Sequence, residues 1–215
     1  MTIYHFIRHG ESEANIQRAQ YICGRSSETP LTEKGHQQAR QLGAWYLQEK
    51  IRLEKIFSST AVRARETATS ICAPLGLDAT LVTMVENIEE KDQGAWTGVL
   101  RSSLHSPELL AVIRSSDGHF APPEGESDRQ AGQRLYDQLI REIIPASQGA
   151  EHVAIVSHGN VIRCMLQYNL QYPVTWENGL HNTSVTSVVH DPQSPEQFQV
   201  LVYNRVDHLE EGPWK

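Results

Sequence analysis

The amino-acid sequence predicts an α/β protein, a three-layer α/β/α sandwich in which helices flank a mostly parallel central sheet. Three observations predict this fold class. Short runs rich in β-branched residues alternate with longer stretches of helical apolar spacing. The run Val-Ala-Ile-Val at 153–156 is apolar without alternation, as in a strand buried on both faces. The last two predicted strands are joined by a short turn, which favours an antiparallel pairing there.

The first half of the chain supplies two strand–helix units. Residues 3–7 form the first predicted strand, and the helix over 32–50 begins with a threonine that can cap its first turn. A short strand at 55–58 precedes a helix over 61–75, whose apolar positions recur at helical spacing. Gly76 suits the C-cap of that helix because glycine adopts the left-handed conformation without steric cost.

The second half begins with a third strand at 80–84 and a loop-rich segment over 86–125, within which 106–115 forms a helix. A helix over 126–144 is expected to stop before Pro145, because proline lacks the N–H that continues a helix. The remaining elements are, in order, a strand at 152–157, a helix at 160–170, and strands at 185–189 and 199–203.

Length and composition restrict the class of protein. The 215 residues suffice for a single domain over 1–215, and we expect a variable cap or insertion at about 98–123. The net charge of −7 and the lack of any Lys/Arg run argue against a nucleic-acid partner, and no apolar run is long enough for a membrane span. Three cysteines without paired spacing and no signal peptide predict reduced thiols in a cytoplasmic protein. The oligomeric state stays open between monomer and homodimer.

Chemistry-bearing residues follow three of the predicted strands. In an open α/β sheet, ligands bind beyond the carboxyl ends of the strands. The residues found there are Arg8-His9-Gly10 after the first strand, Ser58-Ser59 with Arg63 after the second, and Ser157-His158-Gly159 at the start of a later helix. The helix N-termini add free N–H groups and positive dipole ends. The sequence therefore predicts an anion site with two histidines and two arginines.

A phosphoryl group suits this combination of side chains. A neutral imidazole is a competent nucleophile near pH 7, so a histidine can attack phosphorus and water can later hydrolyse the phosphohistidine. The arginines would neutralise the phosphoryl oxygens, so the scheme needs neither a metal nor a cofactor. It does need a proton donor for the leaving alkoxide, and the candidates are Glu11, Glu90 and Asp92.

Six motifs follow one another along nearly the whole chain. They are Arg-His-Gly-Glu at 8–11, Pro-Leu-Thr at 30–32, Arg-Ala-Arg-Glu-Thr-Ala at 63–68, Glu-Lys-Asp-Gln-Gly-Ala-Trp at 90–96, Pro-Glu-Gly-Glu-Ser at 123–127 and Ser-His-Gly-Asn at 157–160. In this order they resemble the motifs of the histidine phosphatase superfamily, the phosphoglycerate mutase-like proteins. The ending Asp-His-Leu at 207–209 resembles that of its broad-specificity phosphatases.

The resemblance implies the phosphoglycerate mutase-like fold and a role for each of five residues. His9 would be the phosphorylated nucleophile, and Arg8 and Arg63 would bind the phosphoryl group. His158 would help to position and stabilise that group, and Glu90 would be the general acid. The implied activity is a metal-independent phosphatase that hydrolyses a small phosphomonoester through a phosphohistidine on His9.

Three further residues are candidates for binding. Asn15 is expected to assist at the phosphoryl group, and Gly159 to contribute to the phosphate site where its helix begins. Arg25 is a candidate for a second anionic group of the substrate. No metal-ligand spacing is present, so the expected partner is a small phosphorylated metabolite.

Two alternatives stay open within this resemblance. One is a 2,3-bisphosphoglycerate-dependent phosphoglycerate mutase, and the other is a phosphoprotein phosphatase. The mutases carry a longer cap with adjacent arginines, whereas here the segment 98–123 is short and Arg101 and Arg114 stand apart. Ala14 also replaces the tryptophan usual in the mutases. The phosphatase is therefore favoured.

Overall fold

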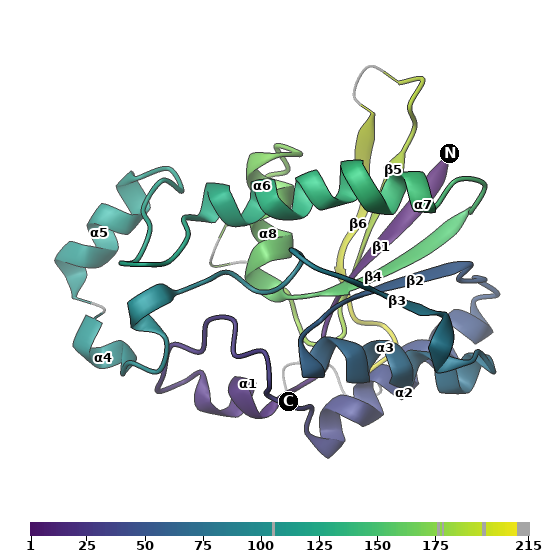
Figure 1. The fold of residues 1–215 in the computed structure, drawn as a ribbon, viewed down its shortest axis with the longest axis horizontal. Coiled ribbons are helices and arrows are strands. Elements are labelled where there is room, and N and C mark those ends of the chain that lie inside the picture. Colours follow the sequence, from purple (N-terminus) through teal and green to yellow (C-terminus); the bar gives the residue numbers. More distant parts are fainter. Residues whose placement is uncertain (105, 176, 178, 195–196, 210–215) are drawn as a thin grey trace.

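A sheet of six strands lies at the centre of the described chain, which comprises residues 1–104, 106–175, 177, 179–194 and 197–209 of a computed structural model. The strands are β1 (Thr2–Arg8), β2 (Lys55–Ser59), β3 (Val82–Val85), β4 (His152–Ser157), β5 (Val185–His190) and β6 (Phe198–Arg205). Their order across the sheet is β3-β2-β4-β1-β5-β6 (Figure 1). Strands distant in sequence are thus neighbours, and crossover connections that contain helices join them.

The sheet is mostly parallel, as predicted. β1 and β2 both pair in parallel with β4, and β2 also pairs in parallel with β3. β5 runs antiparallel to its neighbours β1 and β6. β1 and β4 lie in the middle and are buried along most of their length, which explains the continuous apolar run in β4. The carboxyl ends of β1, β2 and β4 meet at one edge of the sheet.

Helices cover both faces of the sheet, which confirms the three-layer α/β/α class (Figure 1). The four that do so are α2 (Glu33–Gln48), α3 (Val62–Leu75), α6 (Asp128–Gln138) and α8 (Gly159–Tyr168). α2 and α3 share a hydrophobic cluster with one face, in which Leu42, Ile71 and Val156 are buried. α6 and α8 share a second cluster with the other face, in which Leu135 and Ile155 are buried. Burial of these side chains is the main driving force that holds the layers together.

Shorter helical elements connect these parts. They are α1 (Glu13–Gln17), α4 (Arg101–Leu104), α5 (Pro107–Ser115), α7 (Ile144–Ala146), the 3-10 helices η1 (Ala79–Leu81) and η2 (Gly94–Trp96), and the π-helix η3 (Leu139–Ile143). The sequence did not predict α1 and α4, because one turn of helix is too short to show a periodic pattern. η1 occupies the start of the third predicted strand, so β3 begins two residues later than expected.

The predicted ends of two helices are confirmed. The Thr32 side chain accepts a hydrogen bond from the backbone N–H of Gly35 (3.0 Å) and caps α2. Gly76 ends α3 with a φ of 64°, in the left-handed region that favours glycine. These local signals position the helices that frame the site described below.

The prediction that the helix after 126 stops before Pro145 is wrong. The helical run starts at α6 and continues through η3 into α7, so Pro145 lies inside its last turn. In η3 the N–H of Ile144 bonds to the carbonyl of Leu139, which is a π-helical step. This wider turn makes room for the proline ring, and the run ends at Ala146.

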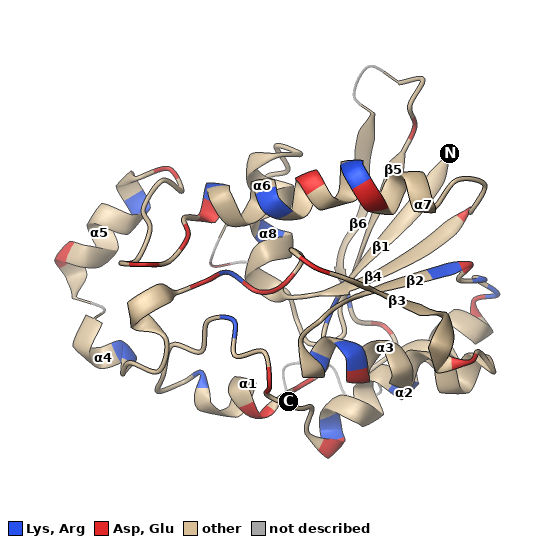
Figure 2. Ribbon diagram, in the orientation of Figure 1, with Lys and Arg blue, Asp and Glu red and all other residues tan. Residues whose placement is uncertain are grey.

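Charge and hydropathy are distributed as in a folded domain around a buried sheet. Figure 2 shows that charged residues lie mainly on helices and connecting segments, while the strands carry few of them. Across the parts of the chain that the structure describes, no helix combines the length and the apolar character that crossing a bilayer requires. The predicted cap contains α4 and α5, which lie beside the start of α6 and away from the sheet (Figure 1).

Candidate active site

The predicted site residues meet at the edge of the sheet where β1, β2 and β4 end. Arg8 ends β1 and His9 follows it, Arg63 lies in the first turn of α3, and His158 directly precedes α8. All four side chains are buried despite their polarity. A pocket of about 80 Å³ opens beside them. The predicted residues that line it are Arg8, His9, Asn15, Arg63, Glu90 and Gly159.

The hydrogen bonds of His9 define its tautomer. Its Nδ1 lies 2.7 Å from the carbonyl oxygen of Gly10, and a carbonyl can only accept, so Nδ1 carries the proton. The guanidinium Nε of Arg63 donates to Nε2 of His9 (3.1 Å), so Nε2 carries the lone pair. His9 and Arg63 both line the pocket, so the Nε2 lone pair lies beside a cationic group at the pocket wall.

The surroundings of His9 keep the ring neutral. Burial, followed by the charges of Arg63 and Arg8, lowers the pKa of His9 well below its ordinary value. The hydrogen bond to Gly10 acts in the opposite direction and is outweighed. A neutral imidazole keeps its Nε2 lone pair, which a nucleophile requires.

The loop after β1 is tied to α3. The N–H of Gly10 donates to the Thr67 hydroxyl (3.0 Å), which in turn donates to the carbonyl of Arg63 (2.6 Å). A side chain at Gly10 would come within 2.6 Å of the carbonyl oxygen of Gly35, so only glycine fits there. His9 and Arg63 are therefore set on one rigid unit.

The two arginines are held by backbone carbonyls. Arg63 donates to the carbonyl oxygens of Ser26 (2.6 Å) and Arg25 (2.8 Å), which directs its Nε toward His9. Arg8 donates to the carbonyl of Leu180. Burial lowers the pKa of Arg8 to about 10, so it remains charged at neutral pH. Both arginines can bind an anion without losing these supports.

His158 lies against His9 and does not itself line the pocket. The two rings meet edge to face, with centroids 5.1 Å apart. Nε2 of His158 lies 2.9 Å from the Ser59 hydroxyl at the end of β2. Burial, followed by the charge of Arg63, lowers the pKa of His158 well below its ordinary value. This ring therefore supports His9 as a neutral group.

Glu90 occupies the N-terminus of α8. One carboxylate oxygen accepts from the N–H groups of Lys91 (2.9 Å) and Val161 (3.1 Å), and the other accepts from the N–H of Asn160 (3.2 Å). A carboxylate is stabilised there by free N–H groups and the helix dipole. Glu90 also lines the pocket, together with Arg8, His9 and Arg63.

The other two acid candidates lie elsewhere. The Glu11 carboxylate is 3.3 Å from the Lys34 ammonium, at the start of α2. Asp92 accepts from the N–H of Gly94 (2.8 Å) in a turn. Neither lines the pocket, so the geometry favours Glu90 among the three.

Comparison with known proteins now identifies the family. Residues 4–204 match the histidine phosphatase superfamily (branch 1). This chain belongs to that superfamily. The chain is 28% identical over 203 residues to a 2,3-bisphosphoglycerate-dependent phosphoglycerate mutase of Rhizobium etli, a match that covers 91% of this chain and 95% of the relative. The resemblance noted in the sequence is thereby confirmed.

Solved structures of histidine phosphatases show the same fold. Bacillus stearothermophilus YhfR superposes with a TM-score of 0.78 and 29% identity, and the match covers 97% of this chain and 99% of that one. A mycobacterial glucosyl-3-phosphoglycerate phosphatase in complex with VO3 superposes with a TM-score of 0.75 and 25% identity, covering 95% and 99%. The neighbours therefore include phosphatases, whereas the curated relative above is named as a mutase.

Asn15 lines the pocket, and Asn182 holds its side chain there. Asn182 donates to the backbone carbonyl of His9 (3.0 Å) and to Oδ1 of Asn15 (2.9 Å). The N–H of Ser12 also donates to that oxygen (3.1 Å). Because Oδ1 is occupied, the NH2 group of Asn15 is the part that can donate to an anion. No role is predicted for Asn182 from the sequence, because its contact with His9 spans 173 residues and arises only in the folded chain.

Arg25 does not take the position expected of a residue that binds a second anionic group of the substrate. Its guanidinium lies 3.7 Å from Asp92 and 3.8 Å from Glu126, and it does not line the pocket. Two acidic neighbours thus satisfy a charge that was expected to face the substrate. The contribution of Arg25 to the site is its backbone carbonyl, which holds Arg63.

Three further arginines line the pocket, although the sequence motifs do not predict them as site residues. They are Arg18 after α1, Arg101 at the start of α4, and Arg163 on α8. Arg163 forms an ion pair with Asp128 (2.7 Å). Cys23 also lines the pocket, and burial raises the pKa of its thiol, so the thiol stays protonated at neutral pH. Within the described residues, no three His, Cys, Asp or Glu side chains come together as a potential metal site.

Proposed function

We propose that this member of the histidine phosphatase superfamily is a metal-independent phosphatase, which hydrolyses a small phosphomonoester through a phosphohistidine on Nε2 of His9. The arrangement of His9 carries this proposal. Its Nε2 lone pair lies 3.1 Å from the Arg63 guanidinium, and both residues line a pocket that Glu90 also lines. The pocket thus brings an imidazole lone pair, a cation and a carboxyl group together within one small space.

The first step transfers the phosphoryl group to His9. Nε2 attacks phosphorus and forms a P–N bond while the bond from phosphorus to the ester oxygen breaks. The electron pair of that bond passes to the ester oxygen, which takes a proton from the carboxyl group of Glu90, so the alcohol leaves neutral. Arg8 and Arg63 stabilise the charge on the three phosphoryl oxygens. The Nδ1 proton stays on the ring, bonded to the Gly10 carbonyl.

The second step returns the enzyme to its starting state. Water attacks phosphorus, and the P–N bond breaks with its electron pair returning to Nε2. The Glu90 carboxylate takes a proton from the water, so inorganic phosphate forms and the acid is restored. Asn160 and Val161 donate to the carboxylate that exists between the two steps.

The charge of the pocket bears on the substrate. Arg18 and Arg101 line it, and neither forms an ion pair with a carboxylate among the described residues. Their charges add to those of Arg8 and Arg63, against the single pocket carboxylate of Glu90. An excess of cations favours a phosphomonoester whose alcohol part carries a further acidic group. The name of the mycobacterial neighbour, a glucosyl-3-phosphoglycerate phosphatase, supports such a substrate.

A mutase is the second candidate, because the Rhizobium etli relative is named as one. In that case an acceptor alcohol in place of water would take the phosphoryl group. The short cap segment favours the phosphatase, since it leaves less structure to exclude water. A phosphoprotein substrate is the third candidate, and a pocket of about 80 Å³ favours a small molecule over it.

The test is phosphate release from a panel of phosphomonoesters in the presence of a chelator. The panel contains p-nitrophenyl phosphate, 3-phosphoglycerate, glycerol 3-phosphate, phosphoserine, sugar phosphates and a nucleotide. We expect hydrolysis by the wild type, none by His9→Ala, and no effect of the chelator. Interconversion of 2- and 3-phosphoglycerate faster than phosphate release would establish the mutase instead, and loss of activity with chelator would contradict the metal-free scheme.

A further inference from the structure

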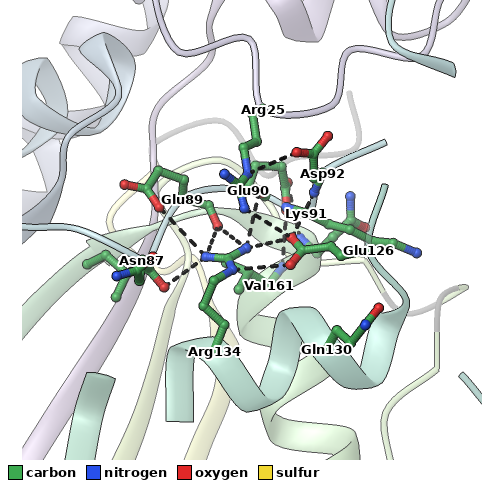
Figure 3. Close-up of polar contacts among 12 residues, drawn as sticks. Arg25, Asn87, Glu89, Glu90, Lys91, Asp92, Glu126, Gln130, Arg134 and Val161 are labelled. Atoms are coloured by element: carbon green, nitrogen blue, oxygen red, sulfur yellow. Dashed lines mark hydrogen bonds and ion pairs between the residues drawn. The ribbon is translucent and has the colours of Figure 1, made fainter. Parts of the chain in front are cut away.

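The segment that carries Glu90, residues 87–92, is held by one arginine of α6. Arg134 Nη1 donates to the carbonyls of Asn87 (2.8 Å) and Glu89 (3.2 Å). Its Nη2 donates to the carbonyls of Glu89 (3.2 Å) and Glu90 (3.4 Å). Figure 3 shows this guanidinium amid the segment, facing its backbone. The Arg134 side chain is only 14% exposed, so these bonds are shielded from water.

Glu126 fixes the guanidinium from the other side. Its two carboxylate oxygens accept from Nε (3.2 Å) and Nη2 (2.6 Å) of Arg134, which makes a bidentate pair. The oxygen that accepts from Nη2 also accepts from the N–H of Asp92 (2.8 Å), and the N–H of Glu126 donates to the carbonyl of Asp92 (3.1 Å). Arg134 and Glu126 together therefore hold the segment at both ends (Figure 3).

The backbone and the carboxyl group of Glu90 are fixed by different helices. α6 supplies the contacts to the backbone through Arg134, and the start of α8 supplies the contacts to the carboxylate. Ser157, at the end of β4, donates to the carbonyl of Ile88 (2.7 Å). Side chains from two elements thus engage the carbonyls of four successive residues, 87–90. The backbone carbonyls of this loop therefore accept hydrogen bonds at four successive residues, although the loop has no regular secondary structure.

We propose that Arg134 is a positioning residue that sets where the Glu90 carboxyl group meets the leaving oxygen of the substrate. This inference rests on the proposed function, in which Glu90 is the general acid. Arg134 does not line the pocket and reaches Glu90 only at its backbone carbonyl, so it acts through Glu90. A general acid must lie within hydrogen-bond reach of the atom that it protonates, so its position governs the rate.

The test compares leaving groups that differ in their need for a proton. Nitrophenolate leaves without protonation, whereas an alkoxide does not. Arg134→Lys keeps the charge but loses the planar fork that spans three carbonyls. We expect kcat/KM for glycerol 3-phosphate or 3-phosphoglycerate to fall about 10- to 100-fold, as for a misplaced catalytic group. We expect kcat/KM for p-nitrophenyl phosphate to fall less than about threefold, because His9 and the phosphate contacts are unchanged.

A double-mutant cycle shows whether the effect passes through Glu90. Glu90→Gln alone should lower the alkyl ester rate selectively, and Arg134→Lys should add little to it in the double variant. Arg141→Lys is the matched control on the same helical run, because its side chain is 76% exposed. Glu126→Gln is the second variant, in case Arg134→Lys does not fold, and should give the same selective loss. Thermal unfolding establishes that each variant is folded.

The outcomes separate this inference from the proposed function. Two results would overturn the positioning role. One is an equal loss of kcat/KM on both classes of ester in a folded Arg134→Lys variant. The other is a full further loss of kcat/KM when Arg134→Lys is added to Glu90→Gln. Failure of the proposed function appears elsewhere, in a wild type that releases no phosphate or in a His9→Ala variant that still does. A selective loss by Arg134→Lys that vanishes in the Glu90→Gln background supports the proposal.

Discussion

The same two strands carry a pair of histidines at each end of the sheet. At the carboxyl ends of β1 and β4, the rings of His9 and His158 lie 5.1 Å apart. Near the opposite ends of these strands, the rings of His5 and His152 lie 5.3 Å apart. His5 and His9 are both buried, and burial is the main cause that lowers the pKa of each. Residue type, ring spacing and the burial of His5 and His9 therefore do not distinguish the two pairs, although His152 is partly exposed and His158 is buried.

The difference lies in what surrounds the ring nitrogens. Nδ1 of His5 bonds to the Ser187 hydroxyl (2.9 Å), and its Nε2 bonds to Nδ1 of His152 (3.1 Å), so the fold uses both nitrogens. Nε2 of His9 faces only a donor, Arg63, in a pocket that can admit an anion. A pair of neighbouring histidines is thus not in itself a candidate site; what distinguishes His9 is a lone pair that faces a cation in an open pocket.

The largest expected effect separates the two pairs directly. His9→Gln removes the proposed nucleophile, and we expect phosphate release to fall by about 10⁴-fold or more, as when a catalytic nucleophile is lost. His5→Gln should leave kcat at neutral pH within about twofold. Steady-state phosphate release by both variants measures this contrast. A His9→Gln enzyme of near wild-type activity, or an equally inactive but folded His5→Gln enzyme, would remove the distinction between the pairs.

The second prediction concerns Arg63, the cation that contacts His9. Arg63→Lys keeps a positive charge but cannot contact His9 and two carbonyls with one planar group. We expect kcat/KM to fall about 10²- to 10³-fold, the usual effect of losing a group that stabilises the transition state. Arg40→Lys is the control, because Arg40 contacts the exposed Glu33 on α2. Equal activity of Arg63→Lys and wild type would show that charge alone suffices at that position.

The site residues that could be predicted from the sequence are those that lie next to the end of a strand or the start of a helix. Arg8, His9 and Gly10 directly follow the predicted strand at 3–7, and the motif around Arg63 opens a helix, so the rule that ligands bind beyond the carboxyl ends of the strands predicted their meeting. The functions of Arg134 and Asn182 could not be predicted this way. Arg134 holds carbonyls that lie more than 40 residues away, and Asn182 bonds to His9 across 173 residues. Such contacts depend on how helices and strands pack, which no local pattern encodes.

The same reasoning explains the errors in the fold. Long helices and buried strands were predicted because their apolar patterns repeat over several turns or residues. The continuation past Pro145 depends on one π turn, which has no sequence signature of its own. The sequence makes Arg25 a candidate for binding an anionic group of the substrate because it lies near the site residues along the chain. In the fold, its guanidinium instead forms ion pairs with Asp92 and Glu126.

A smaller effect is expected where the backbone of α8 approaches Arg8, which we propose binds the phosphoryl group. A Cβ at Gly159 would lie 3.3 Å from both Cδ and Nε of Arg8, which is tighter than ordinary contact. Gly159→Ala should therefore shift the guanidinium by a few tenths of an ångström and lower kcat/KM about tenfold. Phosphate inhibition should weaken in parallel, because Arg8 binds the anion. Unchanged phosphate inhibition in a folded variant would show that Arg8 is not displaced.

The smallest expected effect on turnover belongs to His5, whose substitution should appear in stability instead. Burial lowers the pKa of His5 to about 3, whereas the unfolded chain has its ordinary value of 6.5. The unfolded state therefore binds more protons between these two values. His5 thus favours the folded state fully above pH 6.5, and this contribution falls as the pH drops toward 3.

His5→Gln removes this titration, so its free energy of unfolding should decline less steeply from pH 6.5 to pH 4. The difference between the two curves should be on the order of 2–3 kcal/mol over that range. Urea unfolding at a series of pH values measures it, and the other acid-sensitive groups are common to both proteins. Parallel curves would show that His5 takes up no proton on unfolding, and the contrast with His9 would then rest on the arginines alone.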